Sequence, residues 1–197
     1  STSTFTVVLD AAPTADVTVS LTGNDTTEGS LSGTTLSETN TLTFTAADWD
    51  TAQTVTITGV DDNLEDGDIT TTLTATANSA GGYSGESTTT TVKNTDDDTN
   101  GITIAQTGTT DGSGNLLTTE AGSTSTFTVV LDAAPTADVT VSITGLDATE
   151  NSLSGSTLSG TNTLTFNAGN WNTAQTVTVA GVDDSIVDGH ITTTLNT

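Results

Sequence analysis

The sequence predicts an all-β protein made of tandem immunoglobulin-like β-sandwich domains arranged end to end. Three observations support this fold class: the chain repeats itself, apolar and polar residues alternate in short runs, and threonine, which favours strands, is the commonest residue. Residues 1–10 return letter for letter as residues 123–132, and later landmarks follow at the same offset of 122 residues, from Ser1 to Ser123. A period this long is typical of an array of whole domains rather than of a solenoid of small units.

The alternating runs predict the strands, because one side of a strand can then face a core and the other side water. Clusters of turn-forming residues separate the runs, and no window shows sustained helical spacing. About seven short strands in roughly 100 residues is typical of an immunoglobulin-like sandwich. In chain order, the predicted strands contain Phe5 to Leu9, Val17 to Leu21, Leu42 to Phe44, Val55 to Ile57, Ile69 to Leu73, Thr90 to Val92 and, opening the second copy, Ile102 to Ile104.

The largest apolar residues of these runs predict the core of each domain. We expect the two tryptophans to plug the sandwiches, although an exposed tryptophan could instead hold a sugar. The residues expected to point inward are Phe44, Trp49 and Val55 in the first copy and Phe166, Trp171 and Val177 in the second.

The phase of the repeat predicts two incomplete domains, at residues 1–99 and 100–197. Residues 101–122 have no counterpart before Ser1, and residues 76–99 have none after Thr197. We therefore expect the first domain to lack its first strand, the second to lack its last, and the chain to be a segment of a longer repeat protein. Unpaired strand edges invite pairing with a neighbouring molecule.

The charge balance excludes several classes of function. The chain has 25 acidic residues but one Lys, Lys93, one His and no Arg, which gives a formal net charge of −24. It therefore offers no basic patch for nucleic acid, and no stretch is apolar enough for direct membrane insertion. Cysteine is absent, and His190 has no equivalent in the first copy, so a Ser-His-Asp arrangement would exist in only one of two similar domains. We expect a protein that is not an enzyme.

The acids gather at the ends of predicted strands, where like charges cost free energy unless a counter-ion binds. Carboxylate oxygens suit Ca²⁺, which takes six to eight oxygen ligands at about 2.3–2.6 Å. The acid clusters therefore predict Ca²⁺ as the partner ion. The acidic loop does not fit an EF-hand, because Asp66 stands where that loop needs glycine. We expect Asp25, Glu28, Asp147 and Glu150 to cap turns or to be solvated.

Three motifs resemble Calx-beta repeats of large bacterial surface proteins and adhesins: NTLTFTAADW at residues 40–49, QTVTITGVDD at 53–62 and VKNTDDD at 92–98. The resemblance covers nearly the whole chain. It implies an immunoglobulin-like sandwich with Ca²⁺ ions clustered at one end. The implied ligands in the first copy are Asp61, Asp62, Asp66, Asp96, Asp97 and Asp98, with Glu65 as an alternative to Asp66; in the second copy they are Glu120, Asp183, Asp184 and Asp188.

These observations predict a calcium-binding structural module of an extracellular surface protein or adhesin. Ca²⁺ would rigidify the array, with neighbouring repeats as partners. One alternative is an adhesive domain that binds carbohydrate or protein, which an exposed aromatic cleft would favour. Another is a subunit of an extracellular filament or surface layer that self-associates by strand complementation.

Overall fold

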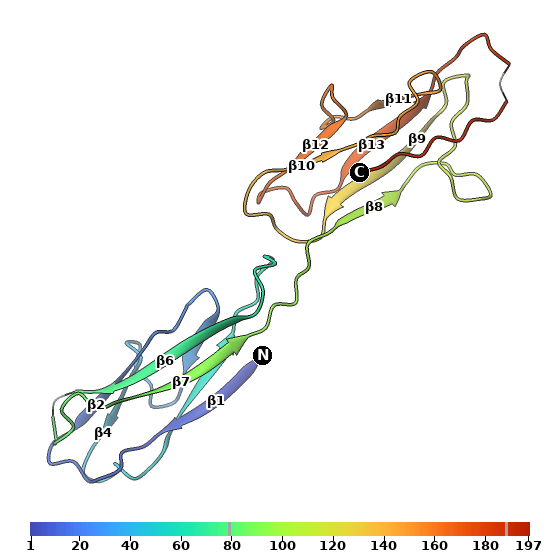
Figure 1. Ribbon diagram of the computed structural model, residues 1–197. Coiled ribbons are helices and arrows are strands. Elements are labelled where there is room, and N and C mark those ends of the chain that lie inside the picture. The colour runs from blue at the N-terminus through green and yellow to red at the C-terminus, as the bar shows by residue number, and fades with distance from the viewer. Residues whose placement is uncertain (79, 188) are drawn as a thin grey trace. The chain divides into compact units, whose positions relative to one another are not determined.

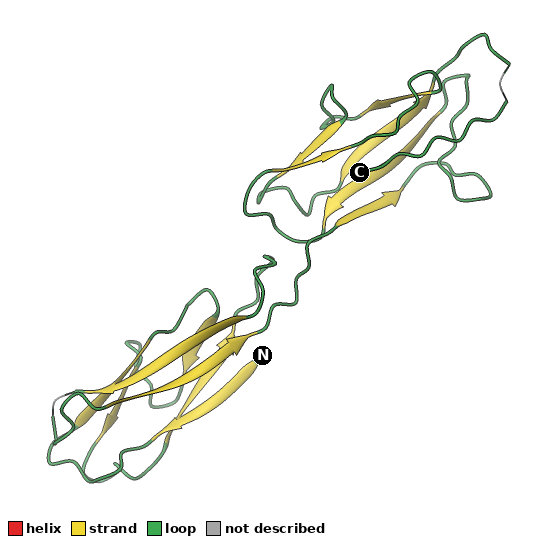
Figure 2. Ribbon diagram, viewed as in Figure 1, coloured by secondary structure: helices red, strands yellow, loops and turns green. Residues whose placement is uncertain are grey.

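The computed structural model describes residues 1–78, 80–187 and 189–197. Within these ranges every element is a strand, turn or loop and none is a helix (Figures 1 and 2), which confirms the all-β class. All strand pairs are antiparallel. The described residues contain no helix that could cross a membrane.

The chain divides into two compact units, each with its own sheets and core. The first unit consists of Ser1–Asp62 and Asp66–Asp97. The second consists of Asn63–Glu65 and Asp98–Thr197.

The first unit contains seven strands in two sheets. A three-stranded sheet has the order β1-β5-β3, and a four-stranded sheet has the order β4-β2-β6-β7. The alternating runs predicted six of these strands, and β3 was not predicted. The bounds are β1 Thr2–Val7, β2 Val17–Thr22, β3 Gly29–Ser32, β4 Thr41–Phe44, β5 Gln53–Gly59, β6 Ile69–Ala77 and β7 Ser87–Asn94.

Within the described residues, the second unit repeats β1 to β5 as β9 to β13 and adds β8. A four-stranded sheet has the order β11-β13-β9-β8, and β10 pairs with β12. The only trace of a β6 equivalent in the described residues is an isolated bridge between Thr144 and Asn196. The bounds are β8 Ile102–Gln106, β9 Thr124–Leu131, β10 Val139–Ser142, β11 Asn151–Ser154, β12 Thr163–Phe166 and β13 Gln175–Gly181.

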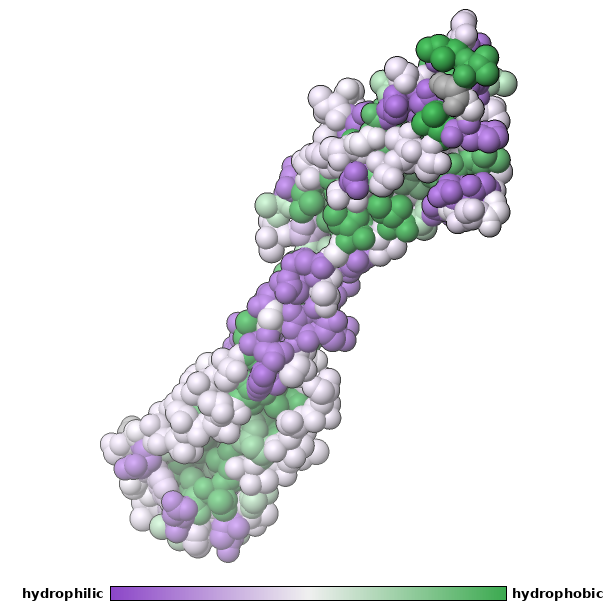
Figure 3. All heavy atoms as spheres, turned by 45° about the vertical axis from the view of Figure 1, so that its right-hand side comes forward, coloured by the Kyte–Doolittle hydropathy of each residue, from purple (hydrophilic) through white to green (hydrophobic). Residues whose placement is uncertain are grey.

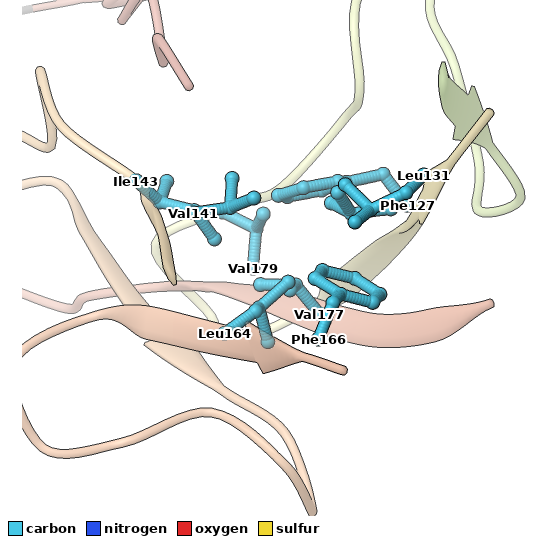
Figure 4. Close-up of a cluster of buried hydrophobic side chains, with 9 residues drawn as sticks. Phe127, Leu131, Val141, Ile143, Leu164, Phe166, Val177 and Val179 are labelled. Atoms are coloured by element: carbon cyan, nitrogen blue, oxygen red, sulfur yellow. The ribbon is translucent and has the colours of Figure 1, made fainter. Parts of the chain in front are cut away.

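Each unit has one hydrophobic core to which strands of both sheets contribute, as a β-sandwich requires. Figure 4 shows this core in the second unit, where Phe127, Val141 and Leu164 belong to different strands and point toward one another. The expected core residues Phe44, Val55, Phe166 and Val177 are fully buried. The two tryptophans, Trp49 and Trp171, are only partly buried and pack against these clusters.

The two copies also share details of their turns. Asn40 and Asn162 occupy equivalent positions and both have a left-handed backbone, with φ of 53° and 56°. Asparagine tolerates this region better than most residues. Each carbonyl accepts a hydrogen bond from an equivalent core residue, Leu21 at 2.8 Å and Ile143 at 2.9 Å. The repeat in sequence is therefore also a repeat in backbone geometry.

Candidate metal site

Strand pairing brings three acidic segments to one end of the first unit. The register of β3 with β5 places Gly29 opposite Gly59, so Glu28 lies beside the end of β5, and the Glu28 carbonyl accepts a hydrogen bond from Val60 N–H at 2.9 Å. The register of β6 with β7 places Ile69 opposite Asn94. The Asn94 amide joins these segments, since it donates to Val60 O at 2.8 Å and to Glu28 Oε2 at 3.2 Å.

Glu28, Asp62 and Asp66 form a carboxylate cluster at this end. One oxygen of each side chain lies within 4.8 Å of the other two. Glu28 is half-buried, whereas Asp62 and Asp66 are exposed. Among the described residues this is the one group of three potential metal-binding side chains at such spacing.

The electrostatics of the cluster disfavour three negative charges. Partial loss of solvent, followed by the charges of Glu28, Asp62 and Asp96, raises the pKa of Asp66. The sequence contains one Lys or Arg, Lys93, and its ammonium lies 2.5 Å from Asp68 Oδ2. The hydrogen bond from Lys93 lowers the pKa of Asp68. The lysine side chain is thus engaged with an acid outside the cluster.

A tight turn holds Asp66 near the segment that follows β7. Gly67 has φ of 79°, a backbone conformation that favours glycine, and its N–H donates to Asp96 Oδ2 at 2.7 Å. In return, the Asp96 N–H donates to Asp68 Oδ1 at 3.1 Å. These two bonds connect the start of β6 to the residues after β7, so Asp96 supports the cluster.

Sequence reasoning identified Asp62, Asp66 and Asp96 as candidate ligands but missed Glu28, which we expected to cap a turn or to be solvated. The neighbouring Asp25 does cap a turn, since its carboxylate accepts bonds from Thr27 N–H at 3.0 Å and Oγ1 at 2.7 Å. The hydrogen bonds from Thr27 lower the pKa of Asp25. The repeat could not have singled out Glu28, because Glu28 and Asp25 both return at the same offset, as Glu150 and Asp147.

The other predicted ligands lie outside the cluster. Glu65 belongs to the second unit, where its carboxylate accepts a hydrogen bond from Asn100, and Asp98 also belongs to that unit. In the second unit, Asp184 Oδ1 accepts a bond from Ile186 N–H at 2.6 Å. Like Glu65, four further predicted ligands are exposed: Asp61, Asp97, Glu120 and Asp183. The predicted ligand Asp188 lies outside the described residues.

The donor set of the cluster fits a hard divalent cation. Three carboxylates present about six oxygen atoms and no nitrogen or sulfur, which suits Ca²⁺ or Mg²⁺ better than zinc or copper. The ligands come from two separate stretches of chain, the turn before β3 and the loop between β5 and β6, so a bound ion would cross-link them. Ca²⁺ accepts irregular and exposed oxygen sites more readily than Mg²⁺, which demands near-octahedral geometry.

The repulsion in the cluster has a testable consequence in metal-free protein. Because the pKa of Asp66 in the folded state lies above its ordinary value of 3.8, folding favours the protonated carboxyl and the charged form costs stability. Asp66→Asn should therefore raise the melting temperature at pH 7. The gain should shrink as the pH falls through the raised pKa and vanish below 3.8. Thermal unfolding in chelator at stepped pH, followed by circular dichroism, measures this difference.

The matched control for this prediction is Asp50→Asn. Asp50 lies at the other end of β5, and the second copy already has asparagine there, Asn172. An equal gain from both variants at pH 7 would show that net charge, and not the cluster, sets the effect.

No protein-family model, curated protein or solved structure matched the chain. A proposal for the function therefore depends on the chemistry of the carboxylate cluster and on the comparison between the two copies.

Proposed function

We propose that the first unit binds Ca²⁺ through Glu28, Asp62 and Asp66, and that the protein is a non-catalytic structural module of an extracellular surface protein or adhesin. The observation that carries this proposal is the convergence of three carboxylates within 4.8 Å. The same unit has a single basic side chain, Lys93, which pairs with Asp68. A cation bound from solution would offset this repulsion.

When bound, Ca²⁺ supplies positive charge and links segments that are far apart in the sequence. Glu28 would fix the turn before β3, Asp62 the loop after β5 and Asp66 the start of β6. The Gly67 to Asp96 hydrogen bond extends this restraint to the residues after β7, where the chain leaves the unit. Ca²⁺ would thus stiffen the unit at its exit and, in a series of such repeats, rigidify the array.

Two further observations support an immunoglobulin-like, Calx-beta-like sandwich as the scaffold. Each unit has a core to which two sheets contribute side chains. The Calx-beta resemblance implies that the double acid and a trailing acid are ligands, and Asp62 and Asp66 belong to these acids. Extracellular modules bind Ca²⁺ with dissociation constants of about 10⁻⁴ to 10⁻³ M. A site of that affinity suits the calcium-rich medium outside cells.

Isothermal titration of Ca²⁺ into the chelator-treated 197-residue chain tests this function. We expect saturable binding with Kd of about 10⁻⁴ to 10⁻³ M. Glu28→Gln and Asp66→Asn should each weaken the binding by about tenfold or more, since each removes a charged ligand from one ion. Asp50→Asn, which removes the same charge outside the cluster, should leave the affinity unchanged.

Two results would reject the proposal. Absence of saturable binding in the parent chain excludes a calcium module. Binding that survives Glu28→Gln and Asp66→Asn but is lost in Glu150→Gln would move the ion to the second copy. Titration with Mg²⁺ at equal ionic strength separates a specific calcium site from charge screening.

A further inference from the structure

Strands β1 and β9 have the same sequence but different neighbours. Residues 1–10 and 123–132 are identical, and both strands pair with an equivalent partner in an equivalent register: Phe5 lies opposite Val55, and Phe127 opposite Val177. β9 has a second neighbour, β8, along its other edge, whereas β1 pairs with β5 alone in its sheet. The chain therefore contains the same strand with and without an edge partner.

The edge partner changes the burial of identical side chains. Ser125, Phe127 and Val129 are 2%, 4% and 0% exposed. Of their counterparts in β1, Ser3 is exposed, and Phe5 and Val7 are half-buried. Figure 3 shows hydrophobic atoms at the surface of the first unit, bordered by pale surface of intermediate hydropathy. The apolar side of β1 is thus incompletely covered.

Residues 101–122 account for the greater burial of the β9 side chains. The Thr126 carbonyl accepts hydrogen bonds from Thr107 N–H at 2.9 Å and Gly108 N–H at 2.8 Å. Ser125 Oγ donates to Thr109 O at 2.7 Å. Leu116 packs against the core cluster of this unit. The segment therefore supplies both a strand ladder and a hydrophobic side chain to this unit, whereas among the described residues no strand pairs with the corresponding edge of β1.

The free edge of β1 carries the same backbone groups that β9 uses. In β9, the Asp132 N–H donates to Gly101 O at 3.0 Å and the Thr126 carbonyl faces β8, so even-numbered residues point toward that partner. The equivalent groups in the first copy are the Thr4 carbonyl and, just after β1, the Asp10 N–H, and Thr6 between them points to the same side. Odd-numbered residues point to β5, as shown by the bond from Gly59 N–H to Ser1 O at 2.8 Å.

We propose that β1 is an acceptor edge for a β-strand with the sequence chemistry of residues 101–122, supplied by a further repeat of the same kind. The β8 to β9 register sets the pairing: the residue equivalent to Ile102 opposite Leu9, that equivalent to Ile104 opposite Val7, and that equivalent to Gln106 opposite Phe5. The chain's own segment is already paired with β9, so a second copy could donate it only by uncovering its own β9. The occupant is therefore a segment that is free to pair.

Binding of a synthetic peptide of residues 101–122 to the full chain tests this assignment, with fluorescence anisotropy as the readout. We expect saturable binding. N-methylation of Ala105 should weaken it by about tenfold or more, because the Ala105 N–H points toward the acceptor strand, as the Thr107 N–H does. N-methylation of Ile104, whose N–H points the other way, should leave binding nearly unchanged. These peptide changes cannot unfold the protein.

The matched change in the protein is Thr6→Pro. It removes an N–H on the free edge and spares the bonds to β5, as edge strands allow. Thr6→Pro should weaken peptide binding by about tenfold or more, and Thr6→Val, which keeps the N–H, should not.

Three results would overturn the proposal: equal binding of the two N-methylated peptides, binding that Thr6→Pro does not change, or no binding of the unmodified peptide. If the last accompanies self-association of the chain that Thr6→Pro abolishes, the occupant is a second copy instead. Sedimentation velocity of both proteins distinguishes this case.

Discussion

Replacing Phe44 with alanine should lower the free energy of unfolding of the first unit by about 3 to 5 kcal/mol. The Phe44 side chain is fully buried, and it packs in the core cluster with Val17 and Leu42. Alanine removes the ring and leaves a cavity that strands β2 and β4 can close only partly. Small domains have total stabilities of about 5 to 15 kcal/mol, so this change should remove a large fraction of the stability of the unit.

Hydrogen exchange followed by mass spectrometry measures this effect, because peptides from each unit report their own unfolding. Phe166→Ala should have a similar effect in the second unit, since Phe166 is equally buried. Val8→Ala is the control: Val8 is 45% exposed, and its truncation should change stability by about 0.5 kcal/mol or less. A loss below about 1 kcal/mol for Phe44→Ala would mean that the ring contributes little to the core.

Calcium at about a hundred times its Kd should stabilise the folded first unit by about 2.7 kcal/mol. A ligand that binds the folded state alone shifts the unfolding equilibrium by mass action. The Glu28 carboxylate meets those of Asp62 and Asp66 only when β3 pairs with β5, so the unfolded chain offers no site with all three ligands. Thermal unfolding with Ca²⁺ and with chelator measures the shift in midpoint.

The double change Asp61→Asn with Asp62→Asn should remove most of this shift, because Asp62 is a member of the cluster. Asp50→Asn should preserve it. Equal midpoints with Ca²⁺ and with chelator in the parent chain would contradict the prediction. Equal shifts with Ca²⁺ and Mg²⁺ would attribute the effect to screening of the net charge of −24.

The alternation of apolar residues was enough to predict most strands but not β3. This strand, Gly29–Ser32, has one apolar residue, Leu31, and its second-copy equivalent β11 likewise has only Leu153. Both are held by pairing with the end of a longer strand, β5 or β13. Such pairing joins residues that are far apart in the sequence, from Ser32 with Thr56 to Gly29 with Gly59, and no local pattern encodes it.

The candidate site likewise has a part that the sequence could predict and a part that depends on strand pairing. Asp62 and Asp66 lie in one acidic loop, so their proximity could be expected from the sequence. The choice of Asp66 over Glu65 depends on the turn at Gly67, and the involvement of Glu28 depends on the pairing of Gly29 with Gly59. The sequence therefore indicates the local part of the candidate site, whereas the part that depends on strand register appears only in the structure.

The single lysine makes the chain a one-site substrate for a protease that cuts after Lys or Arg. The susceptible bond joins Lys93 to Asn94, at the end of β7, where Lys93 is paired with Thr70 of β6. Proteases require an extended, unpaired backbone, so cutting here requires β7 to separate from β6. When that opening is fast and reversible, the cleavage rate reports its equilibrium population. Each cut gives two fragments. The rate at which they appear therefore measures how often β7 separates from β6 beside the carboxylate cluster.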